Sequence, residues 1–104
     1  AFERRRALVV DMLNAAPGLR CPVPEGAFYV FPSIAGCIGR KTKGGTVITD
    51  DDVFVKALLA EKGVAVVHGG AFFGPGHFRL SYASDDTTLR DACKRIQDFC
   101  KEMT

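Results

Sequence analysis

The stretch GVAVVHGGAFFGPGHFRLSYA, residues 63–83, contains two β-prone runs joined by a short glycine-rich connection. Val64 to Val67 is a continuous apolar run, which is typical of a buried strand. In the second run, His77 to Ala83, apolar and polar residues alternate, so this strand has one apolar and one polar face. Parallel neighbours need a crossover of about a dozen residues or more. Because the connection here is shorter, the strands of the sheet cannot all be parallel.

Two helices are predicted upstream of this stretch. Apolar residues at helical spacing indicate an amphipathic helix from Phe2 to Ala16, which Pro17 and Gly18 end. A second helix is predicted to begin at Thr49, whose hydroxyl can cap free backbone amides. Three aspartates follow it, where the helix dipole favours negative charge. Gly63 is expected to end this second helix.

The remaining segments complete the order of elements. Ala27 to Phe31 is an aromatic, β-prone run that stops at Pro32, which predicts a strand. Ser33 to Thr49 is glycine-rich and shows no sustained period, which predicts a long loop. The chain ends in its clearest amphipathic helix. The apolar positions of that helix are Leu89, Ala92, Cys93, Ile96, Phe99, Cys100 and Met103.

The order of these segments predicts the fold class. Helix, strand, loop, helix, strand, strand and helix fit an α/β fold of the α+β type, in two layers, with a small, mainly antiparallel sheet that helices cover on one face. The predicted strands are Ala27–Phe31, Val64–Val67 and His77–Ala83. With 47% hydrophobic residues and eight phenylalanines in 104 residues, residues 1–104 are expected to form one compact domain.

Composition and charge argue against several classes of partner. The net charge is only +2 and basic residues alternate with acidic ones, so we expect no basic patch for nucleic acid or an anionic membrane. There is no apolar run of about eighteen residues, and Ala1 to Arg4 lacks the apolar core of a signal peptide. These features predict a cytoplasmic protein. A chain that begins inside a helical pattern without methionine is also expected to be part of a longer protein.

The four cysteines, Cys21, Cys37, Cys93 and Cys100, are expected to be reduced thiols, because a domain with a normal core needs no disulfides. No pair has CxxC spacing, and neither histidine lies at ligand spacing from a cysteine, so no zinc pattern is present. Cys93 and Cys100 share the apolar stripe of the last helix, which indicates core packing.

Three features resemble parts of known sites, and for each a structural role is the stronger prediction. Gly36 to Gly45 lacks the glycine directly before lysine that a phosphate loop requires, so it is predicted to be a flexible, solvated loop. His68 could act as an acid or base, but no carboxylate or nucleophile lies at a telling distance in the sequence. No lysine lies in an apolar setting that favours Schiff-base chemistry. The lysines are Lys41, Lys43, Lys56, Lys62, Lys94 and Lys101.

Arg79 is the candidate binding residue. It lies on the polar face of the His77–Ala83 strand, after a glycine-rich turn that lets a ligand or another backbone segment approach. An arginine on a strand is more often a solvated or ion-paired surface residue, so spacing alone does not assign its role.

Four stretches together resemble one protein family. They are PEGAFYVFP (residues 24–32), GVAVV (63–67), GGAF (69–72) and HFRLSYA (77–83). In combination they are similar to the C-terminal small domain of the class I/II pyridoxal-phosphate aminotransferases, and the likeness covers nearly all of the chain. The loop SIAGCIG (33–39) looks most like that of bacterial aspartate aminotransferases. His68 and Gly70 depart from the pattern, which often has proline and serine there.

This resemblance implies a fold, a reaction and a role for Arg79. The implied fold is that of the aminotransferase small domain. The implied reaction transfers an amino group between an amino acid, with aspartate favoured, and a 2-oxo acid, in a full-length enzyme that is a homodimer. The arginine at the position of Arg79 would bind the α-carboxylate of the substrate. This agrees with chemistry, because a guanidinium stays charged and binds a carboxylate through two parallel hydrogen bonds.

The resemblance also implies what this chain lacks. In that family the Schiff-base lysine, the aspartate that pairs with the pyridine nitrogen and the phosphate-binding groups belong to the large domain, and no stretch here resembles them. The chain is therefore expected to contain no catalytic, cofactor-binding or metal-binding residue, to bind no pyridoxal phosphate and to be inactive alone. Its partners would be the missing large domain and the amino-acid and 2-oxo-acid substrates.

A competing hypothesis is a small α/β ligand- or nucleic-acid-binding module. In it, Phe78 and Tyr82 would be exposed residues that stack on bases. They share a face with Leu80, which favours a place in the core. A reading frame that continues well upstream and contains a Ser-Lys motif would favour the aminotransferase.

Overall fold

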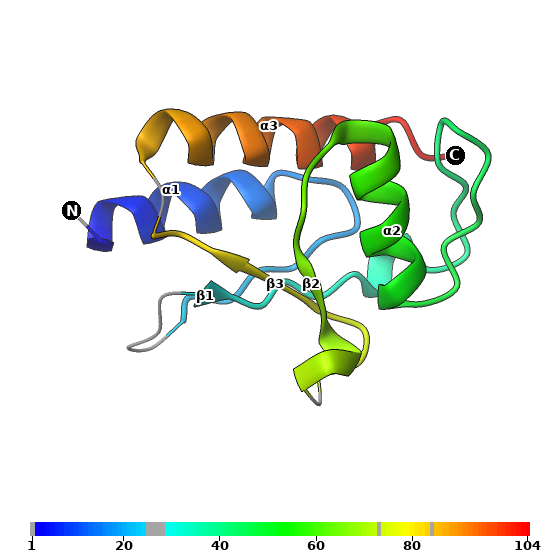
Figure 1. Cartoon of the computed structure of the whole chain (residues 1–104), viewed down its shortest axis with the longest axis horizontal. Coiled ribbons are helices and arrows are strands. Elements are labelled where there is room, and N and C mark those ends of the chain that lie inside the picture. Colours follow the sequence, from blue (N-terminus) through cyan, green and yellow to red (C-terminus); the bar gives the residue numbers. More distant parts are fainter. Residues whose placement is uncertain (1, 25–28, 73, 84) are drawn as a thin grey trace.

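The helices and strands form two layers within residues 2–24, 29–72, 74–83 and 85–104, which the computed structural model describes. Helices α1 and α3 lie side by side over one face of the sheet, and α2 packs beside strand β2 and against α3 (Figure 1). The predicted α/β class, with helices on one face of a sheet, is confirmed. The elements are α1 (Phe2–Asn14), β1 (Tyr29–Val30), a 3-10 helix (Ala35–Cys37), α2 (Asp51–Lys62), β2 (Val67–His68), a second 3-10 helix (Gly69–Phe72), β3 (Phe78–Ser81) and α3 (Asp86–Lys101).

Strand β3 is the central strand of the sheet. The strand order is β1-β3-β2, and β3 pairs antiparallel with both neighbours. In this register Tyr29 of β1 lies opposite Ser81, and Val67 of β2 lies opposite Arg79. The mainly antiparallel sheet predicted from the short connection is therefore confirmed.

Strand β2 differs from its prediction. It comprises Val67 and His68, whereas Val64–Val67 was the expected range. Residues 64–66 carry no strand assignment, yet Val64 is buried and Val66 packs against the core. The apolar character of this run therefore reflects packing against the core and not membership of the sheet.

The other two strands are also shorter than expected. Strand β3 covers four residues of the predicted His77–Ala83 run, and Tyr82 is buried just beyond its end. Of the predicted Ala27–Phe31 strand, Tyr29 and Val30 form β1, while residues 27 and 28 lie outside the described residues.

Side-chain hydrogen bonds lie at the C-terminal end of α1 and at the start of α2. Helix α1 ends at Asn14, two residues before the expected Ala16, and the amide of Asn14 exchanges two hydrogen bonds with the backbone of Cys21. The prediction that Thr49 caps α2 is wrong. Asp50 is the cap, and its carboxylate accepts a 2.9 Å hydrogen bond from the Val53 amide. Thr49 lies one residue too early, since a capping side chain accepts from the amide two or three residues later.

Gly63 ends α2 as predicted, in the left-handed conformation with φ of 70° that glycine adopts without strain. Asp85 caps α3, and its carboxylate accepts a 2.8 Å hydrogen bond from the Thr88 amide.

No helix in the described part of the chain is both long enough and apolar enough to span a bilayer.

The core lies between the sheet and the helices. Phe54 of α2 stacks on Phe78 of β3 with ring centroids 5.4 Å apart, and meets the ring of Phe99 of α3 edge-on at 5.2 Å. Helix α1 adds Val9 and Leu13, which are fully buried. All four cysteines are buried and carry free thiols. The predicted core face of α3 is confirmed, since Cys93 and Cys100 are among its buried residues.

The long segment 33–49 is more ordered than the predicted flexible loop. It contains a 3-10 helix, and the side chains of Ile34 and Ile48 are fully buried. Backbone hydrogen bonds join Lys41 to Thr104 in both directions, so the segment is fastened to the C-terminus. The segment lacks a sequence period because its order comes from such distant contacts.

Candidate functional site

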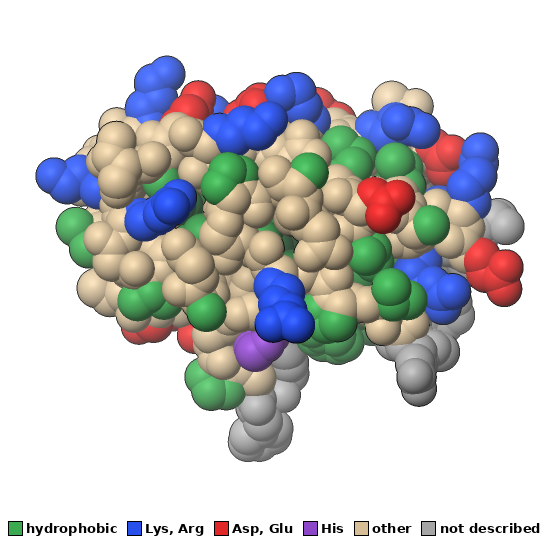
Figure 2. Space-filling model, turned by 180° about the vertical axis from the view of Figure 1, so that it is seen from behind, with side chains coloured by type: hydrophobic (Ala, Val, Ile, Leu, Met, Phe, Trp, Pro, Cys, Tyr) green, Lys and Arg blue, Asp and Glu red, His purple; other side chains and the backbone are tan. Residues whose placement is uncertain are grey.

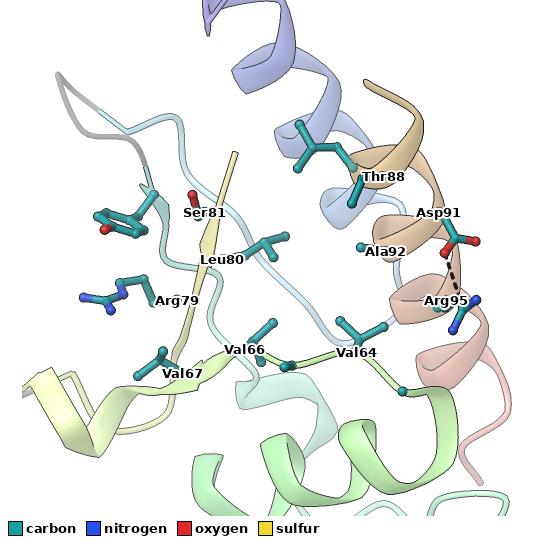
Figure 3. A pocket seen from close by; sticks show the side chains of 14 residues that line it. Val64, Val66, Val67, Arg79, Leu80, Ser81, Thr88, Asp91, Ala92 and Arg95 are labelled. Atoms are coloured by element: carbon teal, nitrogen blue, oxygen red, sulfur yellow. Dashed lines mark ion pairs between the residues drawn. The ribbon is translucent and has the colours of Figure 1, made fainter. Parts of the chain in front are cut away.

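Arg79 lies on the face of the sheet that the helices leave uncovered. Its side chain and that of Val67 point away from α3, whereas Leu80 points toward α3 (Figure 3). Phe78 and Leu80 are buried and Arg79 is half-buried, so the alternation predicted for this strand is confirmed. The core face of β3 thus fixes the direction in which the guanidinium projects.

Tyr29 is the neighbour that defines the surroundings of Arg79. The central carbon of the guanidinium lies 4.5 Å from the centroid of the Tyr29 ring. A cation over an aromatic face is stabilised by the ring quadrupole, and this contact uses none of the N–H donors. Tyr29 and Val67 are both more than one third exposed, so they flank Arg79 on a surface open to solvent.

A pocket of about 470 Å³ adjoins this arginine. It is lined by the Val64–Val67 segment, by Arg79 to Ser81 of β3 and by residues of α3. Its lining is mixed, with the apolar side chains of Val64, Leu80 and Leu89 beside the polar ones of Thr88, Asp91 and Arg95. Both residues of β2 pair with β3, whereas residues 64–66, which precede β2, are not paired with β3 and line the pocket.

The second arginine of the pocket is held by other groups. Arg95 forms an ion pair of 3.0 Å with Asp91 and donates a 2.9 Å hydrogen bond to the carbonyl of Lys62 (Figure 3). The guanidinium of Arg79 can meet an anion through the planar fork that matches a carboxylate. Arg79 is therefore a cationic side chain on the uncovered face of the sheet, at the edge of a pocket of mixed lining, and it points away from the α3 side of that pocket.

His68 lies beside two carboxylates with which no sequence pattern connects it. Its Nδ1 lies 3.4 Å from an oxygen of Asp51 without hydrogen-bond alignment, and its Nε2 lies 3.9 Å from an oxygen of Asp52. Both aspartates belong to the first turn of α2, far from His68 in sequence. His68 therefore contacts the carboxylates at the start of α2.

Asp51 is buried and is the partner of the loop that precedes β3. Its carboxylate accepts hydrogen bonds from the amides of Gly70, at 2.9 Å, and Gly76, at 3.1 Å. Burial opposes ionisation of this group, but the amide hydrogen bonds and the contact with His68 outweigh it and lower the pKa of Asp51. The carboxylate is therefore charged at neutral pH.

The lysines of this chain do not fit the covalent anchor of pyridoxal phosphate. Such a lysine needs a lowered pKa, which burial among apolar groups provides. Five of the six lysines are exposed, and the half-buried Lys62 forms a 2.7 Å ion pair with Glu102. The pKa of Lys56 is raised by its ion pair with Asp52. Among the described residues no group of three or more histidine, cysteine or acidic side chains could hold a metal ion.

The Gly36–Gly45 segment is not arranged as a phosphate site. The hydroxyl of Thr42 donates a 2.7 Å hydrogen bond to Glu61, and the amide of Gly44 donates to the same carboxylate. The hydroxyl and amide donors of this segment are thus used by a carboxylate of the same chain, although the segment is more ordered than the flexible, solvated loop that was predicted.

The alternative of a base-stacking sheet does not fit. Phe78 is fully buried and Tyr82 is 3% exposed, so neither ring is available for stacking. On the face that Figure 2 shows, basic and acidic side chains are interspersed and no cluster of one sign gathers.

Sequence reasoning identified Arg79 but missed Tyr29, Asp51 and the pocket. Tyr29 was included in a predicted strand, but its closeness to Arg79 depends on the register between β1 and β3. The contacts of Asp51 with the loop join residues 19 and 25 positions apart. The position of Asp51 after the cap of α2 was visible in the sequence, but it indicated only the start of a helix and not a contact with the connection.

Comparisons with known proteins agree on one family. A family model described as aminotransferase class I and II matches residues 1–96. The chain is 62% identical over 100 residues to an aspartate/prephenate aminotransferase of Cereibacter sphaeroides, covering 96% of this chain and 25% of that protein. It is 47% identical over 104 residues to an aspartate aminotransferase of Rhizobium meliloti, covering 100% and 25%.

Solved structures give the same result. The crystal structure of the aspartate aminotransferase from Rhizobium meliloti matches with a TM-score of 0.96 and 47% identity, over 99% of this chain and 26% of that one. An alanine aminotransferase from Pyrococcus furiosus matches with a TM-score of 0.83 and 33% identity, over 97% and 24%. This chain spans about a quarter of the length of the curated relatives it matches. With nearly all of its residues matched in sequence and in fold, the chain belongs to the class I and II aminotransferase family.

Proposed function

We propose that this chain, residues 1–104, is the C-terminal small domain of a pyridoxal-phosphate-dependent aminotransferase. The whole enzyme would transfer an amino group between an amino acid, with aspartate favoured, and a 2-oxo acid, as a cytoplasmic homodimer. The names of the relatives, aspartate and aspartate/prephenate aminotransferases, support this reaction. The observation that carries the proposal is Arg79, which projects from the uncovered face of the sheet beside the pocket and the ring of Tyr29.

Within that enzyme, this chain would bind and orient the substrate carboxylate. Pyridoxal phosphate, held by the large domain, would supply the electron sink for the reaction. The two parallel hydrogen bonds of a guanidinium fix both the position and the plane of a carboxylate. The ring of Tyr29 restricts the guanidinium, which would limit the orientations that a bound carboxylate can take.

Kinetics of the full-length enzyme carrying Arg79→Ala or Arg79→Lys test the proposal. Losing one partner of a buried charge pair costs about 2–5 kcal/mol, which corresponds to a fall of about 30-fold to several thousandfold in kcat/KM. Lysine should restore little, because a point charge does not reproduce two parallel hydrogen bonds. Arg90→Ala, an exposed arginine of α3, is the matched control. A folded Arg79→Ala enzyme whose kcat/KM falls less than about threefold would refute the role of Arg79.

The isolated chain is expected to bind no pyridoxal phosphate and to transfer no amino group, because its lysines are exposed or ion-paired. The purified chain is mixed with pyridoxal phosphate, treated with borohydride and digested for peptide mapping. We expect at most scattered, substoichiometric labelling of the exposed lysines. Stoichiometric labelling of one lysine would show that this chain holds the cofactor.

A further inference from the structure

The connection between β2 and β3 determines how β2 meets β3, the strand that carries Arg79. It folds back on itself, with hydrogen bonds from the Gly69 amide to the His77 carbonyl and from the Gly74 amide to the Gly69 carbonyl, both 2.7 Å. A Cβ at Gly69 would overlap the carbonyl oxygen of Gly74, so only glycine fits there. The connection is a tight, specific structure that ends directly before the strand of Arg79.

Asp51 holds both ends of this connection. Gly70 lies just after β2 and Gly76 lies just before β3, and both amides donate to the carboxylate of Asp51. The aspartate is 6% exposed, and it lies in the first turn of α2, where the helix dipole stabilises its charge. The titratable groups nearest to it are His68 of β2, Asp50, which caps its helix, and Asp52, which pairs with Lys56.

The sheet alone gives this region little stability. Strand β2 has only two residues, and pairs of short strands are marginal without further support. Val67 of β2 lies opposite Arg79 in the sheet, and both residues line the pocket. Whatever fixes the connection therefore also fixes the spacing between Val67 and Arg79.

We propose that Asp51 is a positioning residue for Arg79, because its buried carboxylate fastens the connection between β2 and β3 to the start of α2. This inference rests on the proposed role of Arg79 in carboxylate binding. Without the carboxylate, the connection between β2 and β3 loses its attachment to the start of α2, and the guanidinium on β3 is held less firmly in place. Substrate binding weakens while the chemistry, which the rest of the enzyme performs, continues.

The test uses the full-length, cofactor-loaded enzyme carrying Asp51→Asn, which keeps the size of the side chain but opposes one amide donor with its own NH₂ group. Hydrogen exchange of the peptide that spans residues 69–77 is measured by mass spectrometry, together with kcat and KM for aspartate. We expect exchange at the Gly70 and Gly76 amides to accelerate about tenfold or more. KM should rise about tenfold, with kcat changed less than about twofold.

Three further variants separate positioning from general stability. Asp52→Asn changes the same charge one residue along the helix, without an amide contact to the connection, and should leave exchange and KM unchanged. Asn14→Ala breaks the contact between α1 and Cys21 and should lower the Tm without changing KM. Asp51→Glu keeps the charge but moves it by one methylene, so its exchange rate and KM should lie between those of the parent enzyme and Asp51→Asn. It replaces Asp51→Asn if that variant does not fold.

Each outcome decides the inference. Faster exchange together with a raised KM supports it. Unchanged exchange in the Asp51 variants overturns it, because the carboxylate then does not hold the connection. Faster exchange with an unchanged KM also overturns it. In that case a fall in kcat/KM for Arg79→Ala would still support the proposed function. An unchanged KM in Arg79→Ala overturns the proposed function itself, whatever the exchange shows.

Discussion

The two faces of strand β3 perform different tasks with neighbouring residues. On the helix side, Phe78 packs against Phe54 in a closed aromatic core. On the uncovered side, Arg79 lies over Tyr29 beside a pocket. The comparison shows how one strand can serve the core with one face and leave the other for the binding role proposed for Arg79, since adjacent side chains point in opposite directions. The core face fixes the direction of the arginine, and the uncovered face can change its chemistry without unfolding the protein.

The largest effect is expected on the core face. Phe78→Ala should lower the free energy of unfolding by about 3–5 kcal/mol, because it leaves a cavity among buried rings. Arg79→Ala should lower it by less than about 1 kcal/mol, since it removes a half-buried side chain and one cation–π contact. Urea denaturation of the chain measures both, with Phe78→Leu as a milder core variant. Equal losses for Phe78→Ala and Arg79→Ala would remove the distinction between the two faces.

A smaller effect is expected for the ring beneath the arginine. Tyr29→Ala in the full-length enzyme should raise KM about two- to fivefold, the equivalent of about 0.5–1 kcal/mol for an exposed cation–π contact. Tyr29→Phe keeps the aromatic face and should stay within about twofold of the parent enzyme. Val47→Ala, an exposed valine of the 33–49 segment, serves as the control. An equal rise in KM for Tyr29→Phe and Tyr29→Ala would assign the effect to the hydroxyl.

Most of the fold could be predicted because its signals are local. Alternation from Phe78 to Tyr82 gave the two faces of β3, and the short connection gave its antiparallel pairing with β2. Errors arose where local signals had two explanations. The apolar Val64–Val67 run fits a strand and a packed segment equally well, and the cap of α2 moved by one residue from Thr49 to Asp50.

The site could be predicted only in part. A binding role for Arg79 was predicted through the resemblance of the HFRLSYA stretch to one family, because spacing alone favours an ordinary surface arginine. Its contact with Tyr29 depends on a register between distant strands, and the hydrogen bonds of Asp51 depend on how α2 meets the connection. Such contacts are set by tertiary packing, which leaves no period in the sequence.

Whether Arg79 recognises the α-carboxylate of the substrate can be tested with one pair of substrates. The full-length enzyme, with and without Arg79→Ala, is assayed with an amino acid and with the same amino acid as its α-carboxamide, which has no negative charge at that group. We predict that the substitution lowers kcat/KM about 30-fold or more for the amino acid and less than about threefold for the amide. Equal losses for the acid and the amide would contradict the claim, because the arginine would then not recognise the carboxylate.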